Sequence, residues 1–159
     1  MLTRLMTSKK VGAWLAGSAL VLALGACAMP APAARKVIAT ADAPAAIGPY
    51  SQAVQVGDML FVSGQLGMDP KTGKIVTDGI RAETIQSMKN LGAILTAAGM
   101  SFDDVVQVQI FVADLNDFAA VNEEYGKFFK SSPPTRATVQ VARLPRDGKI
   151  EIALTALHH

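Results

Sequence analysis

Two hydrophobic periods alternate along this 159-residue chain, and their order constrains the fold more than any other feature. Apolar residues three or four apart predict a helix from about Asp78 to a stop at Gly99, and a second helix that Asn116 or Asp117 caps and that runs to Phe129. The period of two typical of strands recurs in six segments: 36–40, 53–56, 59–63, 106–112, 137–142 and 149–157. Helices interleaved in this way with strands pack on one face of a mixed sheet. The sequence therefore predicts an α+β two-layer sandwich.

The first 26 residues have the composition of a targeting segment. Three basic residues precede an apolar run, 11–26, that is short for a stable bilayer span. The run ends in Leu-Gly-Ala before Cys27, the single cysteine of the chain, and this pattern resembles a bacterial lipobox. We expect residues 1–26 to be a signal peptide, Cys27 to be lipidated, and residues 27–35 to be a Pro/Ala tether. Plain secretion and an uncleaved anchor are the alternatives.

This segment also predicts a location. The folded domain, residues 36–159, is expected to be exported and held in the bacterial cell envelope by its lipid, at the periplasmic face of the outer membrane. If Cys27 carries no lipid, we expect a periplasmic protein. Membrane contact is expected only through the lipid anchor.

Charge and cysteine content narrow the function classes. Residues 1–26 hold three of the 15 Lys and Arg and none of the 13 Asp and Glu, so 12 basic residues face 13 acidic ones in the remainder, a formal charge of −1. A domain near neutrality without a basic run is not typical of a nucleic-acid-binding protein. With Cys27 in the leader, the domain has no thiolate and no cysteine metal ligand. His158 and His159 are expected to lie at a frayed end.

The stretch from Pro133 to Ala153 suggests a binding site. Arg136 starts a β-branched run after two prolines that restrict the backbone, and its guanidinium is a planar fork suited to a small carboxylate. A surface or intersubunit ion pair is the ordinary alternative. On the second strand, Ala153 lies two residues beyond Glu151 on the same face, where acid–base chemistry would want a carboxylate.

Four segments of the chain carry a resemblance to a known family: 47–54 (IGPYSQAV), 61–75 (FVSGQLGMDPKTGKI), 111–129 (FVADLNDFAAVNEEYGKFF) and 142–152 (ARLPRDGKIEI). In this order they resemble the RidA/YjgF family of imine deaminases, over about residues 36–157. The resemblance implies a chorismate-mutase-like α+β fold and a homotrimer with sites between subunits. It also implies hydrolysis of small 2-imino and enamine acids to 2-oxo acids and ammonia. Since the sequence has no HExxH, P-loop, GxSxG or dinucleotide-binding motif, we expect no cofactor and no metal.

The resemblance also assigns residues. It gives Arg136 the substrate carboxylate, and it places a threonine, Thr138, where many members have a cysteine. The other substrate-binding positions that it implies are Tyr50, Ser63, Gly64 and Asn122.

The resemblance further implies a glutamate at position 153, where this chain has Ala153, with Glu151 roughly 6.5–7 Å along the strand. The catalytic residue is therefore left unassigned. At that distance Glu151 is expected to be too far to replace the missing acid without rearrangement. Three functions stay open: a deaminase, weakened by the missing acid, a non-enzymatic envelope protein that binds small carboxylates, or a holdase-like or structural trimer.

Overall fold

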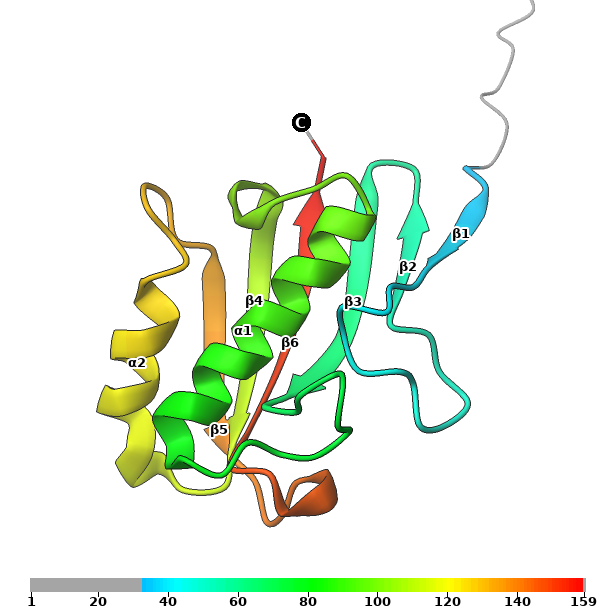
Figure 1. Ribbon diagram of the computed structural model, residues 1–159. Helices are drawn as coiled ribbons and strands as arrows, with labels where there is room; N and C mark the ends of the chain where they lie inside the picture. Colours follow the sequence, from blue (N-terminus) through cyan, green and yellow to red (C-terminus); the bar gives the residue numbers. More distant parts are fainter. Residues whose placement is uncertain (1–32, 159) are drawn as a thin grey trace, which may run out of the picture. The chain divides into compact units, whose positions relative to one another are not determined.

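One mixed sheet organises the residues that the computed structural model describes, 33–158 (Figure 1). Its strands are β1 Arg35–Ile38, β2 Ala53–Val56, β3 Met59–Leu66, β4 Val105–Val112, β5 Thr135–Gln140 and β6 Ile150–Leu157. The spatial order is β1-β2-β3-β6-β4-β5, in which β4 and β5 pair in parallel and all other neighbours are antiparallel. The helices α1 Gly79–Ala97 and α2 Phe118–Gly126 cover the same face of the sheet. The predicted α+β two-layer architecture is confirmed.

The core forms where the helices meet the sheet. Alternate residues of β6, from Ile150 to Ala156, are at most 4% exposed, and the intervening residues face the other side of the sheet. Met88, Leu91 and Leu95 of α1 are fully buried against this strand and its neighbours, as their helical spacing predicts. Burying one such side chain contributes about 1.5–3 kcal/mol. Among residues 33–158 no helix covers the other face of the sheet, which is called the open face below.

Turns and helix ends follow local chemistry with some differences from expectation. Gly57 has φ +58° in the β2–β3 hairpin, and Gly99 has φ +76° just past α1, where a left-handed residue ends a helix.

The second helix is shorter than predicted: α2 ends at Gly126, and the chain continues to Phe129 in tighter i→i+3 turns. Asp117 is the N-cap residue of α2 but makes no capping hydrogen bond.

Strand β3 is longer than predicted because it continues through an irregularity. The strand was expected to end at Ser63, but pairing with β6 shifts between Val62 and Gln65 and then resumes to Leu66. The shift places Ser63 and Gly64 in a β-bulge, a feature that re-aims side chains and is frequent beside functional sites.

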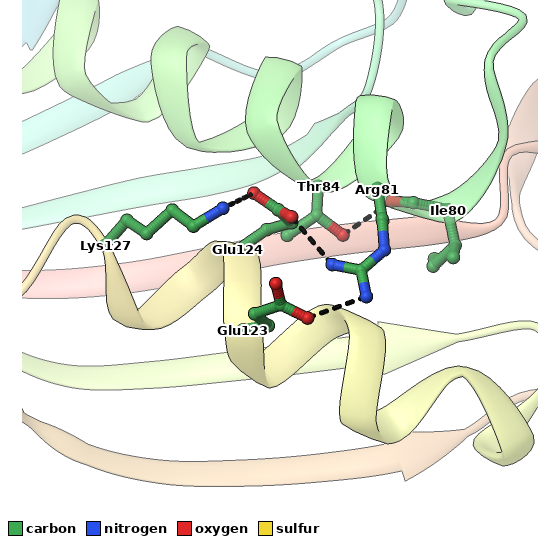
Figure 2. Close-up of polar contacts among 6 residues, drawn as sticks. All are labelled: Ile80, Arg81, Thr84, Glu123, Glu124 and Lys127. Atoms are coloured by element: carbon green, nitrogen blue, oxygen red, sulfur yellow. Dashed lines mark hydrogen bonds and ion pairs between the residues drawn. The ribbon is translucent and has the colours of Figure 1, made fainter.

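An ion-pair network fastens α2 to α1 (Figure 2). Arg81 of α1 donates to Glu123 at 2.7 Å and to Glu124 at 2.8 Å, and Lys127 donates to the second oxygen of Glu124 at 2.6 Å. The Lys127 ammonium and the Arg81 guanidinium lower the pKa of Glu124, whose side chain is only 6% exposed. Both carboxylate oxygens of Glu124 are thus satisfied, which fixes the position of α2 on the sheet.

The predicted signal peptide, the lipidated Cys27 and most of the tether lie outside the described residues. Within residues 33–158, no helix has the length and hydrophobicity that crossing a membrane requires.

Candidate functional site

A cavity of about 270 Å³ lies between the 44–50 loop, the β3 bulge and the start of β6. Tyr50, Ser63 and Gly64 line it, as does Glu151. The remaining lining side chains are largely apolar: Pro44, Ala45, Ile47, Leu66, Met68 and Pro145, with Gln65. The cavity therefore combines one carboxylate with a small hydrophobic wall.

Glu151 supplies the carboxylate among the residues that line this cavity. Within residues 33–158 it makes no hydrogen bond and no ion pair, and burial raises its pKa above the usual range for glutamate. It lies directly against the backbone of Gly64, where a Cβ would overlap the carboxylate. Gly64 thus makes room for Glu151 in addition to lining the cavity.

Hydrogen bonds hold the Tyr50 side of the cavity. The amide of Gln52, which is 5% exposed, accepts from the Thr40 N–H and donates to carbonyls of the 40–44 loop. The Ser63 hydroxyl donates to the Ser51 carbonyl at 2.7 Å, so toward a ligand this oxygen is an acceptor. Tyr50 is 48% exposed, and its hydroxyl accepts from the Ile47 N–H at 3.3 Å.

A side chain of α1 contacts the backbone at the start of β6. The buried carboxylate of Glu83 accepts the Lys149 N–H at 2.7 Å, two residues before Glu151. Burial raises the pKa of Glu83, and the bond from the Lys149 backbone opposes that rise. The contact orients the strand that presents Glu151.

The other predicted residues form a second group at the β5 edge of the sheet. Arg136 pairs with Val108 and Thr138 with Ile110, so both face the helix side, where α2 carries Asn122. The Arg136 guanidinium carbon lies 4.9 Å from the centre of the Tyr125 ring and 5.7 Å from that of Phe118. Phe118 is 39% exposed and not turned into the core as its spacing predicts.

One chain keeps these two groups apart. Strands β6 and β4 lie between the bulge of β3 and strand β5. At the usual spacing of neighbouring strands, the distance across the sheet from β3 to β5 is roughly 14 Å. Arg136 faces the helices, whereas Glu151 pairs with Phe111 on the open face. The structure therefore unites Tyr50, Ser63 and Gly64 with Glu151, and leaves Asn122, Arg136 and Thr138 as a separate group.

Ala153 does not belong to the small cavity. It lines a wider hollow of about 640 Å³ on the open face, with Gln107, Gln109 and Phe61, and this hollow adjoins the cavity at Tyr50 and Ser63. The small cavity nevertheless contains a carboxylate, because the bulge and Gly64 leave space for the side chain of Glu151.

Metal binding has no support among the described residues: within 33–158 no group of three or more His, Cys, Asp or Glu side chains is placed to hold an ion. His158 is not frayed as expected. Its N–H donates to the Asp58 carbonyl at 2.8 Å, and its Nδ1 lies 3.7 Å from an Asp104 oxygen. His159 lies outside the described residues.

Comparison with known proteins identifies the family to which this chain belongs. Residues 40–158 match the family model described as Endoribonuclease L-PSP. The 2-iminobutanoate/2-iminopropanoate deaminase of Mus musculus is 53% identical over 123 residues, which cover 77% of this chain and 91% of that protein. The protein of the same name from Homo sapiens is 52% identical, with 77% and 90% covered.

Solved structures agree with the fold. The YjgF gene product of E. coli is 49% identical with a TM-score of 0.75, covering 78% of this chain and 99% of its own. E. coli TdcF, solved with bound serine, is 46% identical with a TM-score of 0.75 and the same coverage. RidA from a Psychrobacter species is 44% identical with a TM-score of 0.74, covering 77% and 98%. The chain therefore belongs to the Endoribonuclease L-PSP family, and its resemblance to RidA/YjgF proteins is confirmed.

Proposed function

We propose that this chain is an enzyme that hydrolyses small 2-imino and enamine acids to 2-oxo acids and ammonia. The observation that carries the proposal is the Glu151 carboxylate, which is half-buried, unpaired among the described residues and directed into a small cavity. The relatives at 52–53% identity that are named as 2-iminobutanoate/2-iminopropanoate deaminases support it.

Glu151 suits both proton transfers of the reaction. Water adds to the carbon of the protonated imine as Glu151 takes a proton from the water, and Glu151 then passes this proton to the nitrogen of the tetrahedral adduct. The C–N bond breaks and ammonia leaves, while the adduct's hydroxyl forms C=O and gives up its proton, which ammonia takes to become ammonium. The Glu151 carboxylate is thereby regenerated. Burial raises the pKa of Glu151, which makes the carboxylate a stronger base, and the proton that it takes from water is the one that it then donates as an acid.

The walls of the cavity favour a small apolar substrate. Ile47, Leu66 and Met68 offer no polar partner to a substrate side chain, whereas the Ser63 hydroxyl oxygen can accept a hydrogen bond from the imine nitrogen. Such a cavity suits a side chain of one or two carbons.

We propose that Arg136 binds the substrate carboxylate, with Asn122 and Thr138 beside it, and that a second copy of the chain completes the site in a homotrimer. The separation of the two groups within one chain supports this assembly. The exposed apolar side chains of the open face, among them Phe61 and Val139, support it as well.

Turnover tests the chemistry directly. Imines made in situ by an amino-acid oxidase would be supplied to the protein, and 2-oxo acid formation followed against buffer. We expect acceleration that Glu151→Gln abolishes. No acceleration by the wild type sinks the enzyme proposal, and saturable binding of 2-oxobutanoate without turnover would favour the carboxylate-binding protein instead.

Mixing two impaired variants tests the shared site, at a substrate concentration far below the KM of Arg136→Ala, where both variants turn over much more slowly than the wild type. Arg136→Ala and Glu151→Gln chains would be unfolded together and reassembled in equal amounts. If each site takes Arg136 from one copy and Glu151 from another, roughly one site in four regains both residues by random assembly. Activity in verified hybrid oligomers that stays at the mean of the two unmixed variants would place both residues of a site in one chain.

We also propose that Cys27 is lipidated and anchors the domain in the cell envelope. The basic start, the apolar run and the Leu-Gly-Ala-Cys pattern support this. Metabolic labelling with a fatty acid, compared between the wild type and Cys27→Ser, tests it. Equal labelling of the two would exclude this residue as the anchor.

A further inference from the structure

The Arg136 guanidinium contacts two aromatic rings of α2, which we call the aromatic pair: Phe118 and Tyr125. The two residues are seven apart and so share one face of the helix. Distances of 5.7 and 4.9 Å from the guanidinium carbon to the ring centres lie within the range of cation–π attraction. This attraction fixes the position of the cation without using its hydrogen-bond donors.

The N–H donors of the Arg136 guanidinium remain available. Within residues 33–158 the Arg136 side chain makes no hydrogen bond and no ion pair, so all five of its N–H groups are available to a ligand. The paired Arg81 shows the contrast, since it spends its donors on Glu123 and Glu124. An arginine held by ring faces alone is prepared to receive a carboxylate.

We propose that Phe118 and Tyr125 are positioning residues that hold the Arg136 guanidinium in the orientation needed for the substrate carboxylate. The proposal rests on the function proposed above, in which Arg136 binds that group. A free arginine side chain loses up to about 2 kcal/mol of rotamer freedom on being fixed. The aromatic pair restricts the side chain before the ligand arrives, and binding is tighter by the part of this cost already met.

The ring of Tyr125 carries this role, and its hydroxyl does not. Tyr125 is 5% exposed, and its hydroxyl is buried without a hydrogen-bond partner among the described residues. Burial raises the pKa of Tyr125 to about 12, so the phenol is neutral and offers no negative charge to Arg136. Phenylalanine should therefore replace tyrosine here, whereas leucine should not.

Binding of 2-oxobutanoate, measured by calorimetry on the assembled protein, tests the proposal. We expect Tyr125→Leu to raise Kd about 3- to 10-fold and Phe118→Leu about 2- to 3-fold, while Tyr125→Phe leaves Kd unchanged. Phe128→Leu is the matched control, because its ring packs on Phe102 and not on Arg136. If Tyr125→Leu does not fold, Phe118→Leu still decides, since that side chain is partly exposed.

A ligand-free readout separates this proposal from the deaminase proposal. In NMR spectra of arginine-labelled protein, ring currents should shift the Arg136 side-chain signals upfield, and Tyr125→Leu should reverse the shift. Unshifted signals, or an unchanged Kd in both leucine variants, would overturn the positioning role. An Arg136→Ala variant with wild-type Kd would overturn it too. Tight 2-oxobutanoate binding with the expected variant pattern but no imine turnover would sustain the aromatic pair and sink only the deaminase.

Discussion

The two halves of the candidate site are built by opposite means. The Glu151 half is enclosed: a bulge, a glycine and an apolar loop surround a carboxylate whose pKa burial raises. The Arg136 half lies open at a sheet edge, and aromatic rings hold its guanidinium with every donor free. A group that moves protons benefits from a low dielectric, whereas a group that captures a charged ligand benefits from access. We therefore expect the Glu151 half to govern the rate of turnover and the Arg136 half to govern the affinity for substrate.

Removing the carboxylate should have the largest effect. We expect Glu151→Gln to lower kcat by about 10²- to 10⁴-fold, with little change in the Kd of 2-oxobutanoate. The wild-type rate should rise as pH increases through the raised pKa of Glu151, because the base must be ionised, and this limb should vanish in the variant. Steady-state kinetics from pH 4 to 8 measure both. Activity recovered by adding Ala153→Glu to Glu151→Gln would contradict the assignment of the acid to Glu151.

Removing the guanidinium should show the opposite pattern. Arg136→Ala should raise KM by about 10- to 100-fold, since a hydrogen bond to a charged group contributes about 1.5–3 kcal/mol, while kcat falls less. Arg136→Lys should recover only part of the affinity, because a lysine lacks the planar fork. A loss of kcat at constant KM in both Arg136→Ala and Glu151→Gln would contradict this division of roles between the two halves.

Gly64 offers a subtler change to the enclosed half. A methyl group at this position overlaps the Glu151 carboxylate, so Gly64→Ala should displace it and lower kcat by roughly 10- to 100-fold. Gly126→Ala is a suitable control, because a Cβ there meets no atom within 4 Å. A Gly64→Ala enzyme with full kcat would show that the carboxylate has room to spare.

The smallest expected effect concerns the support of β6. Burial raises the folded-state pKa of Glu83, so its charge disfavours folding at neutral pH, and its contribution to stability is greatest below the ordinary glutamate pKa. Glu83→Gln keeps an acceptor for the Lys149 N–H without that charge. We expect it to gain stability over the wild type, on the order of 1 kcal/mol, as pH rises through the folded pKa. Urea unfolding at pH 4 and pH 7 measures this, and a gain that is larger at pH 4 has the wrong sign.

Local patterns predicted most of the fold, because they depend on neighbours in the sequence. The alternation in β6, the stripe of α1 and the stop at Gly99 all appear where their residues indicate. The predicted second helix is too long at its C-terminal end. Phe128 and Phe129 have helical spacing in the sequence, but they pack on Phe102 from i→i+3 turns that follow α2.

The candidate site was harder to predict, because it depends on long-range pairing. Each of the six residues implied by resemblance lies on one of two surfaces, but their division follows from the insertion of β6 between β3 and β4. The bulge at Ser63 and Gly64 has no marker other than the glycine. Without it, Glu151 and Ala153 look equivalent on one strand face, and the sequence does not show that only Glu151 lines the small cavity.

The central place of β6 has a consequence for how the molecule forms. The last strand in the sequence lies between β3 and β4, so the first three strands and the β4–β5 pair share no ladder until residues 150–157 arrive. A ribosome-bound chain cannot close its sheet before residues 150–157 have left the ribosome. Such late closure slows folding and keeps the chain unfolded for longer.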